Sequence, residues 1–185
     1  MSGTMTHTLV VAGFGGQGVL SLGMTVARAG LAAGYEVSWL PSYGPEQRGG
    51  TAHCEVVISE ESIPLPMVSH PQTLIVLNLP SLRKFADKVM PGGTLICESG
   101  LESFVTRDDL LIVPVDSMGT AAELGHARIA NMVLLGVFVG LTRLFDEDEV
   151  SEALAKVLPV RHHDLLPMNM AAVQRGMAIG QSVRR

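Results

Sequence analysis

Short apolar runs alternate along the first part of the chain with a segment of helical spacing. Residues 8–12 read Thr-Leu-Val-Val-Ala and end in glycines, and residues 17–33 carry apolar side chains at helical spacing. Gly34 follows directly and suits the end of a helix. The pattern predicts a strand, a turn and a helix, with a second strand at residues 35–40.

Residues 51–59 show a strict alternation. Ala52 and Cys54 fall on one face with Val56 and Ile58, opposite a more polar face that includes Glu55, as in a half-buried strand. Three more buried strands are expected at residues 74–79, 94–97 and 110–115, with a helix at 81–89 and a turn at 91–93. Strands that alternate with helices predict a largely parallel sheet.

The last third of the chain has helical spacing. A short helix to Leu124 is followed by helices at residues 129–144, 147–158 and 167–180, and Asp146 with Glu149 predicts a capping box. The helix at 129–144 is apolar nearly all round, so we expect it to be covered on more than one side. The fold class is α/β, a single domain over residues 1–185: a doubly wound, mostly parallel, Rossmann-like sheet with a helical C-terminal part.

Composition narrows the class of protein. Of 185 residues, 47% are hydrophobic and only 17% charged, which is too apolar for disorder and favours an oligomer or a buried subunit. A net charge of -5 without a basic stripe argues against nucleic acid as a partner. The first residues lack a secretory signal, and residues 129–142 are shorter than the roughly 20 needed to span a membrane. We expect a cytoplasmic protein with no membrane partner.

A glycine-rich turn follows the first strand. It matches G-x-G-x-x-G, whose backbone N–H groups and following helix suit a phosphate. Dinucleotide-binding folds also place a carboxylate at the end of the second strand, and residues 38–42 here contain none. The alternative is that the glycines only permit tight packing of the helix or approach of another chain. The candidate residues are Gly13, Gly15, Gly16, Gln17 and Gly18.

A polar, glycine-rich loop is expected after the second strand. Loops at the carboxyl ends of neighbouring parallel strands converge, so we expect this loop beside the glycine turn. An aromatic ring, a guanidinium and three glycines suit a shaped surface, although a solvated loop with an ion pair between Glu46 and Arg48 is the alternative. The candidate residues are Ser42, Tyr43, Gly44, Glu46, Arg48, Gly49, Gly50 and Thr51.

Other reactive residue types indicate little chemistry. Asn131 opens an apolar helix and either makes a capping or core hydrogen bond or contacts a ligand or partner chain. Cys54 falls on an apolar strand face, and with Cys97 it makes only two thiols, too few for an iron–sulfur cluster. The adjacent His162 and His163 do not face one another on a helix, which argues against a shared metal. We therefore expect no catalytic residue and no metal ligand.

Two segments together carry a family resemblance. The turn Gly-Phe-Gly-Gly-Gln-Gly-Val at 13–19 and Trp-Leu-Pro-Ser-Tyr-Gly-Pro-Glu-Gln-Arg-Gly-Gly-Thr at 39–51 closely resemble the gamma subunits of 2-oxoacid:ferredoxin oxidoreductases. The resemblance continues through residues 56–59, Asn78 and residues 131–136. The chain departs from the usual pattern at Gln47, where Met is common.

The resemblance implies a multisubunit enzyme that converts a 2-oxoacid and coenzyme A to an acyl-CoA and CO2 while reducing ferredoxin. Such a complex uses thiamine diphosphate, Mg and [4Fe-4S] clusters, held by alpha, beta and ferredoxin-like delta subunits. This chain would bind none of these cofactors alone, would form the approach for coenzyme A, and would itself be inactive. The isolated subunit could also form a homodimer. As the substrate of the complex, 2-oxoglutarate fits somewhat better than pyruvate or branched-chain and indole 2-oxoacids.

Two other readings stay open. One is a self-sufficient nucleotide-binding enzyme that uses the glycine turn, and the other is a pure scaffold subunit whose turn contacts only protein. The missing ribose carboxylate favours the subunit over the nucleotide-binding enzyme.

Overall fold

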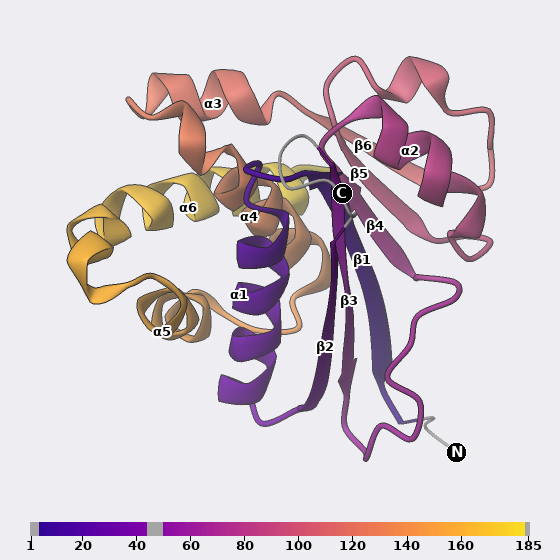
Figure 1. Ribbon diagram of the computed structural model, residues 1–185, viewed down its shortest axis with the longest axis horizontal. Helices are drawn as coiled ribbons and strands as arrows, with labels where there is room; N and C mark the ends of the chain where they lie inside the picture. Colours follow the sequence, from indigo (N-terminus) through magenta and orange to yellow (C-terminus); the bar gives the residue numbers. More distant parts are fainter. Residues whose placement is uncertain (1–3, 44–49, 184–185) are drawn as a thin grey trace.

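A computed structural model of the chain describes residues 4–43 and 50–183, and these form one six-stranded sheet with helices on both faces (Figure 1). The strands are β1 (Thr6–Phe14), β2 (Glu36–Tyr43), β3 (Thr51–Ser59), β4 (Thr73–Val76), β5 (Thr94–Glu98) and β6 (Leu111–Val115). The α-helices are α1 (Val19–Ala32), α2 (Leu79–Phe85), α3 (Ser117–Glu123), α4 (Ala130–Thr142), α5 (Glu147–Val157) and α6 (Leu166–Val183). Short 3-10 helices are η1 (Ala86–Lys88), η2 (Glu102–Phe104), η3 (Ala127–Ile129) and η4 (Val160–Leu165).

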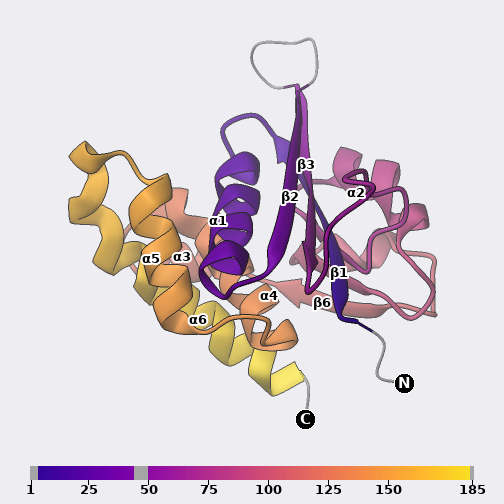
Figure 2. The ribbon, with the colours of Figure 1, turned by 90° about the horizontal axis from the view of Figure 1, so that it is seen from below.

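The strand order is β2-β3-β1-β4-β5-β6. Strands β1, β4, β5 and β6 are parallel, whereas β3 is antiparallel to both β1 and β2. Helices α1 and α4 pack on one face, with α5 and α6 outside them, and α2 packs on the other face. The doubly wound α/β fold expected from the sequence is thus confirmed (Figures 1 and 2).

The β2–β3 hairpin differs from the expectation. We expected the second strand to end at Leu40 and to neighbour the first, but β2 continues to Tyr43 and β3 lies between β2 and β1. Proline is tolerated at position 41 because β2 is an edge strand. No further strand lies on its outer side, so the missing N–H costs no hydrogen bond there. Ser42 and Tyr43 are therefore strand residues, not loop residues, and they lie one strand away from the glycine turn.

Strand alternation divides the core into two layers. In β1, Leu9 and Val11 pack in the larger layer, beneath α1 and α4, while Val10 and Ala12 pack in the smaller layer beneath α2. A central strand that is buried on both faces reads as a continuous apolar run, which explains residues 8–12.

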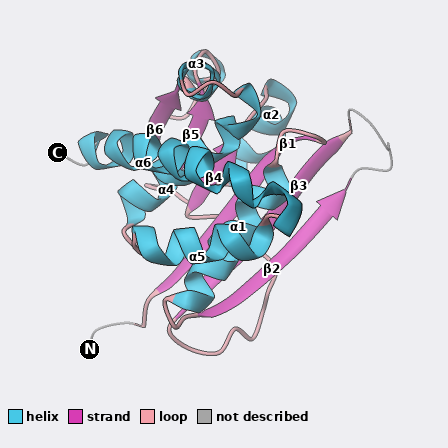
Figure 3. Ribbon diagram, turned by 90° about the vertical axis from the view of Figure 1, so that its left-hand side faces the viewer, coloured by secondary structure: helices cyan, strands magenta, loops and turns pink. Residues whose placement is uncertain are grey.

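Helix α4 is buried along residues 130–140, which confirms the expectation that it is covered on more than one side. It lies between the sheet and α6 (Figure 3). A Cβ added at Gly136 would lie 2.0 Å from the carbonyl oxygen of Val173, and one added at Gly176 would lie 2.0 Å from that of Val133. The two helix backbones are therefore in direct contact through glycines of both helices.

The helix ends follow their capping residues. The expected capping box at Asp146 and Glu149 is present at the start of α5. Helix α2 begins at Leu79, earlier than the expected residue 81, because the Asn78 side chain accepts a hydrogen bond from the Ser81 N–H at 2.9 Å. Within the described residues, no helix is long and apolar enough to cross a membrane.

Candidate functional site at the carboxyl edge of the sheet

The carboxyl ends of the parallel strands meet at one edge of the sheet. Helix α1 leaves β1 toward one face and α2 leaves the neighbouring β4 toward the other, which makes this edge a topological switch point (Figure 1). Ligands of open α/β sheets bind in the crevice at such points. A cavity of about 260 Å³ opens there. Its polar lining comes from Gly16, Gln17, Glu98, Ser117, Arg128 and Asn131.

The glycine turn has a backbone conformation that only glycine adopts readily. Gly16 and Gly18 have φ angles of 93° and 76°, in the left-handed region. The Gly15 N–H donates to the Gly50 carbonyl at 3.0 Å, and the Gln17 N–H donates to the Phe14 carbonyl at 3.2 Å. The N–H groups of Gly15 and Gln17 are therefore already hydrogen-bonded to the protein. An anion would be attracted mainly by the first turn of α1.

The Gln17 side chain joins the turn to the next strand. Its Oε1 accepts hydrogen bonds from the Phe14 N–H at 2.7 Å and from Asn78 Nδ2 at 3.1 Å. Its Nε2 donates to the Leu77 carbonyl at 3.4 Å. Because both ends of this amide bond to protein, Gln17 orders the mouth of the cavity.

Asn131 connects α4 to the same turn. This buried side chain donates from Nδ2 to the Gly18 carbonyl at 3.1 Å, which is the core hydrogen bond that the sequence left as one of two alternatives. It also lines the cavity, so a ligand contact is compatible with this bond.

The opposite wall of the cavity brings together residues that the sequence did not single out. Glu98 ends β5, and its Oε2 accepts a short hydrogen bond from the Ser117 hydroxyl. Arg128, in η3, is exposed and supplies a positive charge to the lining. A signal was present for Glu98 and Ser117, since Glu98 ends one parallel strand and Ser117 closely follows the end of another, where ligand-binding side chains gather. The sequence around Arg128 contains no pattern that predicts a place for this residue in a binding site.

The structure places only part of the predicted loop after the second strand beside the glycine turn. Thr51 pairs with Phe14 across β3 and β1, and Gly50 bonds to Gly15, so both lie beside the glycine turn as expected. Tyr43 is 71% exposed and pairs with Ala52, farther from the cavity. Gly44, Glu46, Arg48 and Gly49 lie outside the described residues.

The two thiols are buried and protonated. Burial raises the pKa of Cys54 to about 12, and burial followed by the charges of Glu102 and Glu98 raises the pKa of Cys97 to about 12. A thiol is nucleophilic and ligates metals only as the thiolate. In residues 4–43 and 50–183, no group of three or more His, Cys, Asp or Glu is placed to hold a metal ion.

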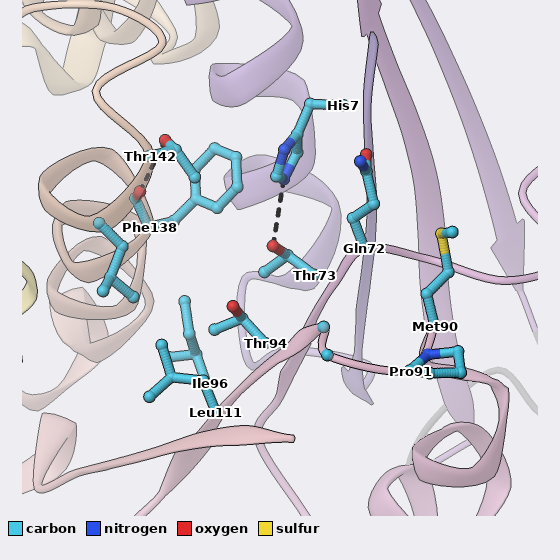
Figure 4. Close-up of a pocket in the computed structure, with 13 residues that line it drawn as sticks. His7, Gln72, Thr73, Met90, Pro91, Thr94, Ile96, Leu111, Phe138 and Thr142 are labelled. Carbon is cyan, nitrogen blue, oxygen red and sulfur yellow. Dashed lines mark hydrogen bonds between the residues drawn. The ribbon is translucent and has the colours of Figure 1, made fainter. Parts of the chain in front are cut away.

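A second cavity, of about 400 Å³, is larger than the first and lies at the amino-terminal ends of the parallel strands (Figure 4). His7 points into it from β1, and its Nε2 bonds to the Thr73 hydroxyl at 3.1 Å. Its ring meets the Phe138 ring edge-on at 5.5 Å. Burial lowers the pKa of His7 from 6.5 to about 4, so the imidazole is neutral at pH 7.

This histidine makes stability depend on pH. Between pH 4 and 6.5 the unfolded chain binds a proton at His7 that the folded chain does not, so the free energy of unfolding falls as the solution is acidified. The full loss is about 3 kcal/mol, by the conversion of pKa units to free energy. Urea unfolding at pH 7 and pH 4.5 should show a smaller acid loss in His7→Gln than in the parent. The exposed His162→Gln variant should retain the parent's loss, and an equal loss in all three proteins would contradict the assignment.

Comparison with known proteins decides the family. Residues 8–179 match the model of the family described as pyruvate ferredoxin/flavodoxin oxidoreductase. The chain belongs to this family. The resemblance seen in the glycine turn and in residues 39–51 is thereby confirmed.

Curated members of the family share much of this sequence. The chain is 44% identical over 168 residues to "Ketoisovalerate oxidoreductase subunit VorA" of Methanothermobacter thermautotrophicus, covering 90% of this chain and 35% of the relative. It is 34% identical over 163 residues to "2-oxoglutarate synthase subunit KorC" of Methanothermobacter marburgensis, covering 84% and 88%. The chain thus spans about a third of the VorA relatives and most of KorC.

Solved structures of the family share the fold. The gamma subunit of a keto/oxoacid ferredoxin oxidoreductase from Geobacter sulfurreducens superposes with a TM-score of 0.81 at 26% identity, covering 95% of this chain and 99% of that chain. A 2-oxoglutarate:ferredoxin oxidoreductase from Magnetococcus marinus, with 2-oxoglutarate, coenzyme A and succinyl-CoA bound, gives 0.85 at 26% identity. There the match covers 96% of this chain and 31% of that chain.

Proposed function

We propose that this chain is a noncatalytic gamma-type subunit of a 2-oxoacid:ferredoxin oxidoreductase that forms acyl-CoA. The observation that carries the proposal is the family match over residues 8–179, together with the likeness to a free-standing gamma subunit along almost the whole of both chains. Its own residues agree with a noncatalytic role, because both thiols are buried and Gln17 and Asn131 bond to the protein itself.

Thiamine diphosphate, Mg and the [4Fe-4S] clusters belong to the other subunits in this proposal. A cluster of this kind takes four thiolates, and the two thiols of this chain are held protonated by burial. The chain's residues therefore do not fit a [4Fe-4S] cluster, and no chemical step is assigned to the chain. Alpha, beta and delta subunits, with ferredoxin as the electron acceptor, are the partners that the proposal requires.

For coenzyme A we propose a supporting role for the carboxyl-edge cavity. The N-terminal turn of α1 and the guanidinium of Arg128 favour negative charge at its mouth, and the glycines allow close approach. The loop that includes Arg48 is part of the proposed approach on the family resemblance alone.

Two 2-oxoacids compete as the substrate of the proposed complex. The sequence resemblance favoured 2-oxoglutarate, in agreement with the KorC relatives at 34% identity or less, but the VorA relatives named for ketoisovalerate are 44% identical. Co-purification of the tagged chain, followed by viologen reduction with coenzyme A and each of 2-oxoglutarate, ketoisovalerate, pyruvate and indolepyruvate, identifies the substrate. Recovery of the chain without any partner or 2-oxoacid-dependent reduction would refute the subunit role.

The coenzyme A role predicts a specific kinetic change. Arg128→Ala in the complex should raise the KM for coenzyme A about threefold to tenfold, since removing a charge-assisted contact costs about 1 kcal/mol, and should leave the KM for the 2-oxoacid unchanged. Arg48→Ala tests the neighbouring loop by the same assay. Arg161→Ala, an exposed arginine in η4, is the control. An unchanged KM for coenzyme A in both test variants would refute the coenzyme A role and would favour the alternative of a pure scaffold subunit.

A further inference from the structure

The face of the sheet covered by α2 holds a separate cavity of about 420 Å³ beside β3. It shares no lining residue with the cavity at the carboxyl edge. Its polar lining is His53, Glu55, Ser69, His70, Lys84 and Lys88. Buried Val10, Val68 and Phe85 form an apolar floor beneath these groups.

Three groups that carry or can take a positive charge gather round one aromatic ring. The ammonium groups of Lys84 and Lys88 lie 5.1 and 5.3 Å from the centre of the Phe85 ring. The His53 ring lies 4.9 Å from the same centre. Cation–π attraction holds an ammonium near a ring face, but the two like charges, one on α2 and one on the following η1, repel each other. The arrangement therefore concentrates positive potential at the cavity.

The negative charge nearby does not cancel this potential. Glu55 is the one carboxylate in the lining, against the two ammonium groups of Lys84 and Lys88, and its Oε2 accepts a hydrogen bond from the Val68 N–H at 2.7 Å. Within the described part of the chain, neither Lys84 nor Lys88 forms an ion pair with a carboxylate. Burial, and then the charge of Lys84, lowers the pKa of His53, with a smaller contribution from Lys88 in the same direction. The positive charges of Lys84 and Lys88 thus act on the His53 imidazole.

We propose that this cavity, defined by His53, His70, Lys84 and Lys88 above the Phe85 ring, binds a small, multiply charged oxyanion. Two ammonium groups supply charge, and the imidazoles supply N–H donors. A nucleic acid backbone is disfavoured because the chain carries a net charge of -5 and the cavity lining holds only two lysines and two histidines. The assignment does not depend on the proposed subunit role.

Calorimetric titration of the full chain at constant ionic strength tests the site, with inorganic pyrophosphate as the phosphate probe and citrate as the carboxylate probe. We expect saturable binding of at least one probe. Lys84→Gln and Lys88→Gln should each weaken binding about fivefold, the effect of one ammonium at a partly exposed site. The affinities of the parent and of the two lysine variants for pyrophosphate and for citrate are compared. The probe that binds more tightly and loses more affinity in the variants indicates whether the ligand is phosphorylated or carboxylated.

Arg83→Gln is the matched control. Arg83 precedes Lys84 on the same helix and carries the same charge, but it lines a different cavity, beside Phe104. If Arg83→Gln weakened binding as much as the lysine variants, the attraction would be that of a general surface charge and the site would be refuted. Absence of saturable binding of both probes to the parent would refute it as well.

Nuclear magnetic resonance of the histidine rings gives a readout that folding defects do not imitate. A bound anion favours the imidazolium, so saturating pyrophosphate should raise the pKa of His53 against the opposing charges of Lys84 and Lys88 and the supporting charge of Glu55, with His70 facing the same hollow. His162, in η4, should show no change and reports nonspecific binding. Binding without any change at His53 would place the anion elsewhere.

Discussion

Gly136→Ala should lower the free energy of unfolding by about 3 kcal/mol and the Tm by about 10 °C, the cost of overpacking a close helix contact. The added methyl would lie 2.0 Å from the Val173 carbonyl oxygen, and that oxygen belongs to the backbone of α6, so α4 and α6 must move apart. The roughly 1 kcal/mol of helix propensity gained by alanine does not offset this separation. Thermal and urea unfolding of the purified chain measure the effect.

Gly30→Ala is the matched control in α1. Its added Cβ would meet the tip of the Val37 side chain at 3.0 Å, so a small side-chain adjustment suffices and stability should change by less than about 1 kcal/mol. Gly176→Ala should resemble Gly136→Ala, and the double variant should cost less than the sum of the two, because helices that have separated once accommodate both methyls. Equal effects at Gly30 and Gly136, or full additivity, would contradict direct backbone contact.

Gly18→Ala should cost about 2 to 3 kcal/mol, for two separable reasons. The φ angle of 76° costs a residue with a side chain about 1 kcal/mol, and the new Cβ would lie 2.3 Å from Asn131 Nδ2, displacing that side chain from its hydrogen bond. Urea unfolding gives the size of the loss.

Gly34→Ala separates the two contributions. Gly34 also has a left-handed backbone, with φ of 88°, but no atom lies within 4 Å of the added Cβ, so only the backbone cost of about 1 kcal/mol remains. Replacing Asn131 with alanine should relieve the clash, so that Gly18→Ala costs about as much as Gly34→Ala in that background. If Gly18→Ala were no worse than Gly34→Ala in the parent, the contact with Asn131 would have no energetic weight.

Much of the fold could be predicted because its signals are local. The apolar run of β1, the alternation in β3 and the capping box before α5 each reflect the burial or hydrogen bonding of consecutive residues. The order of β2 and β3 could not be predicted in the same way. Which strands become neighbours depends on pairing between segments far apart in the chain, and an edge strand reads much like an inner one over a few residues.

The candidate site was predictable on one side only. The glycine turn carries its own signature, whereas the opposite wall is assembled from Glu98, Ser117 and Arg128, which the fold brings together from separate strand and helix ends. Asn131 was noticed as a polar residue on an apolar helix, but its partner, the Gly18 carbonyl, is a backbone group that carries no sequence signal.

The glycine contact between α4 and α6 also orders events during synthesis. Helix α4 emerges from the ribosome before α6, and until α6 docks, one side of this uniformly apolar helix has no cover. The same delay affects β1, which is made early but pairs with β4 only after some sixty residues more have been added. Nascent chains halted before α6 should therefore be clients of molecular chaperones, and release from them should coincide with the arrival of Gly176.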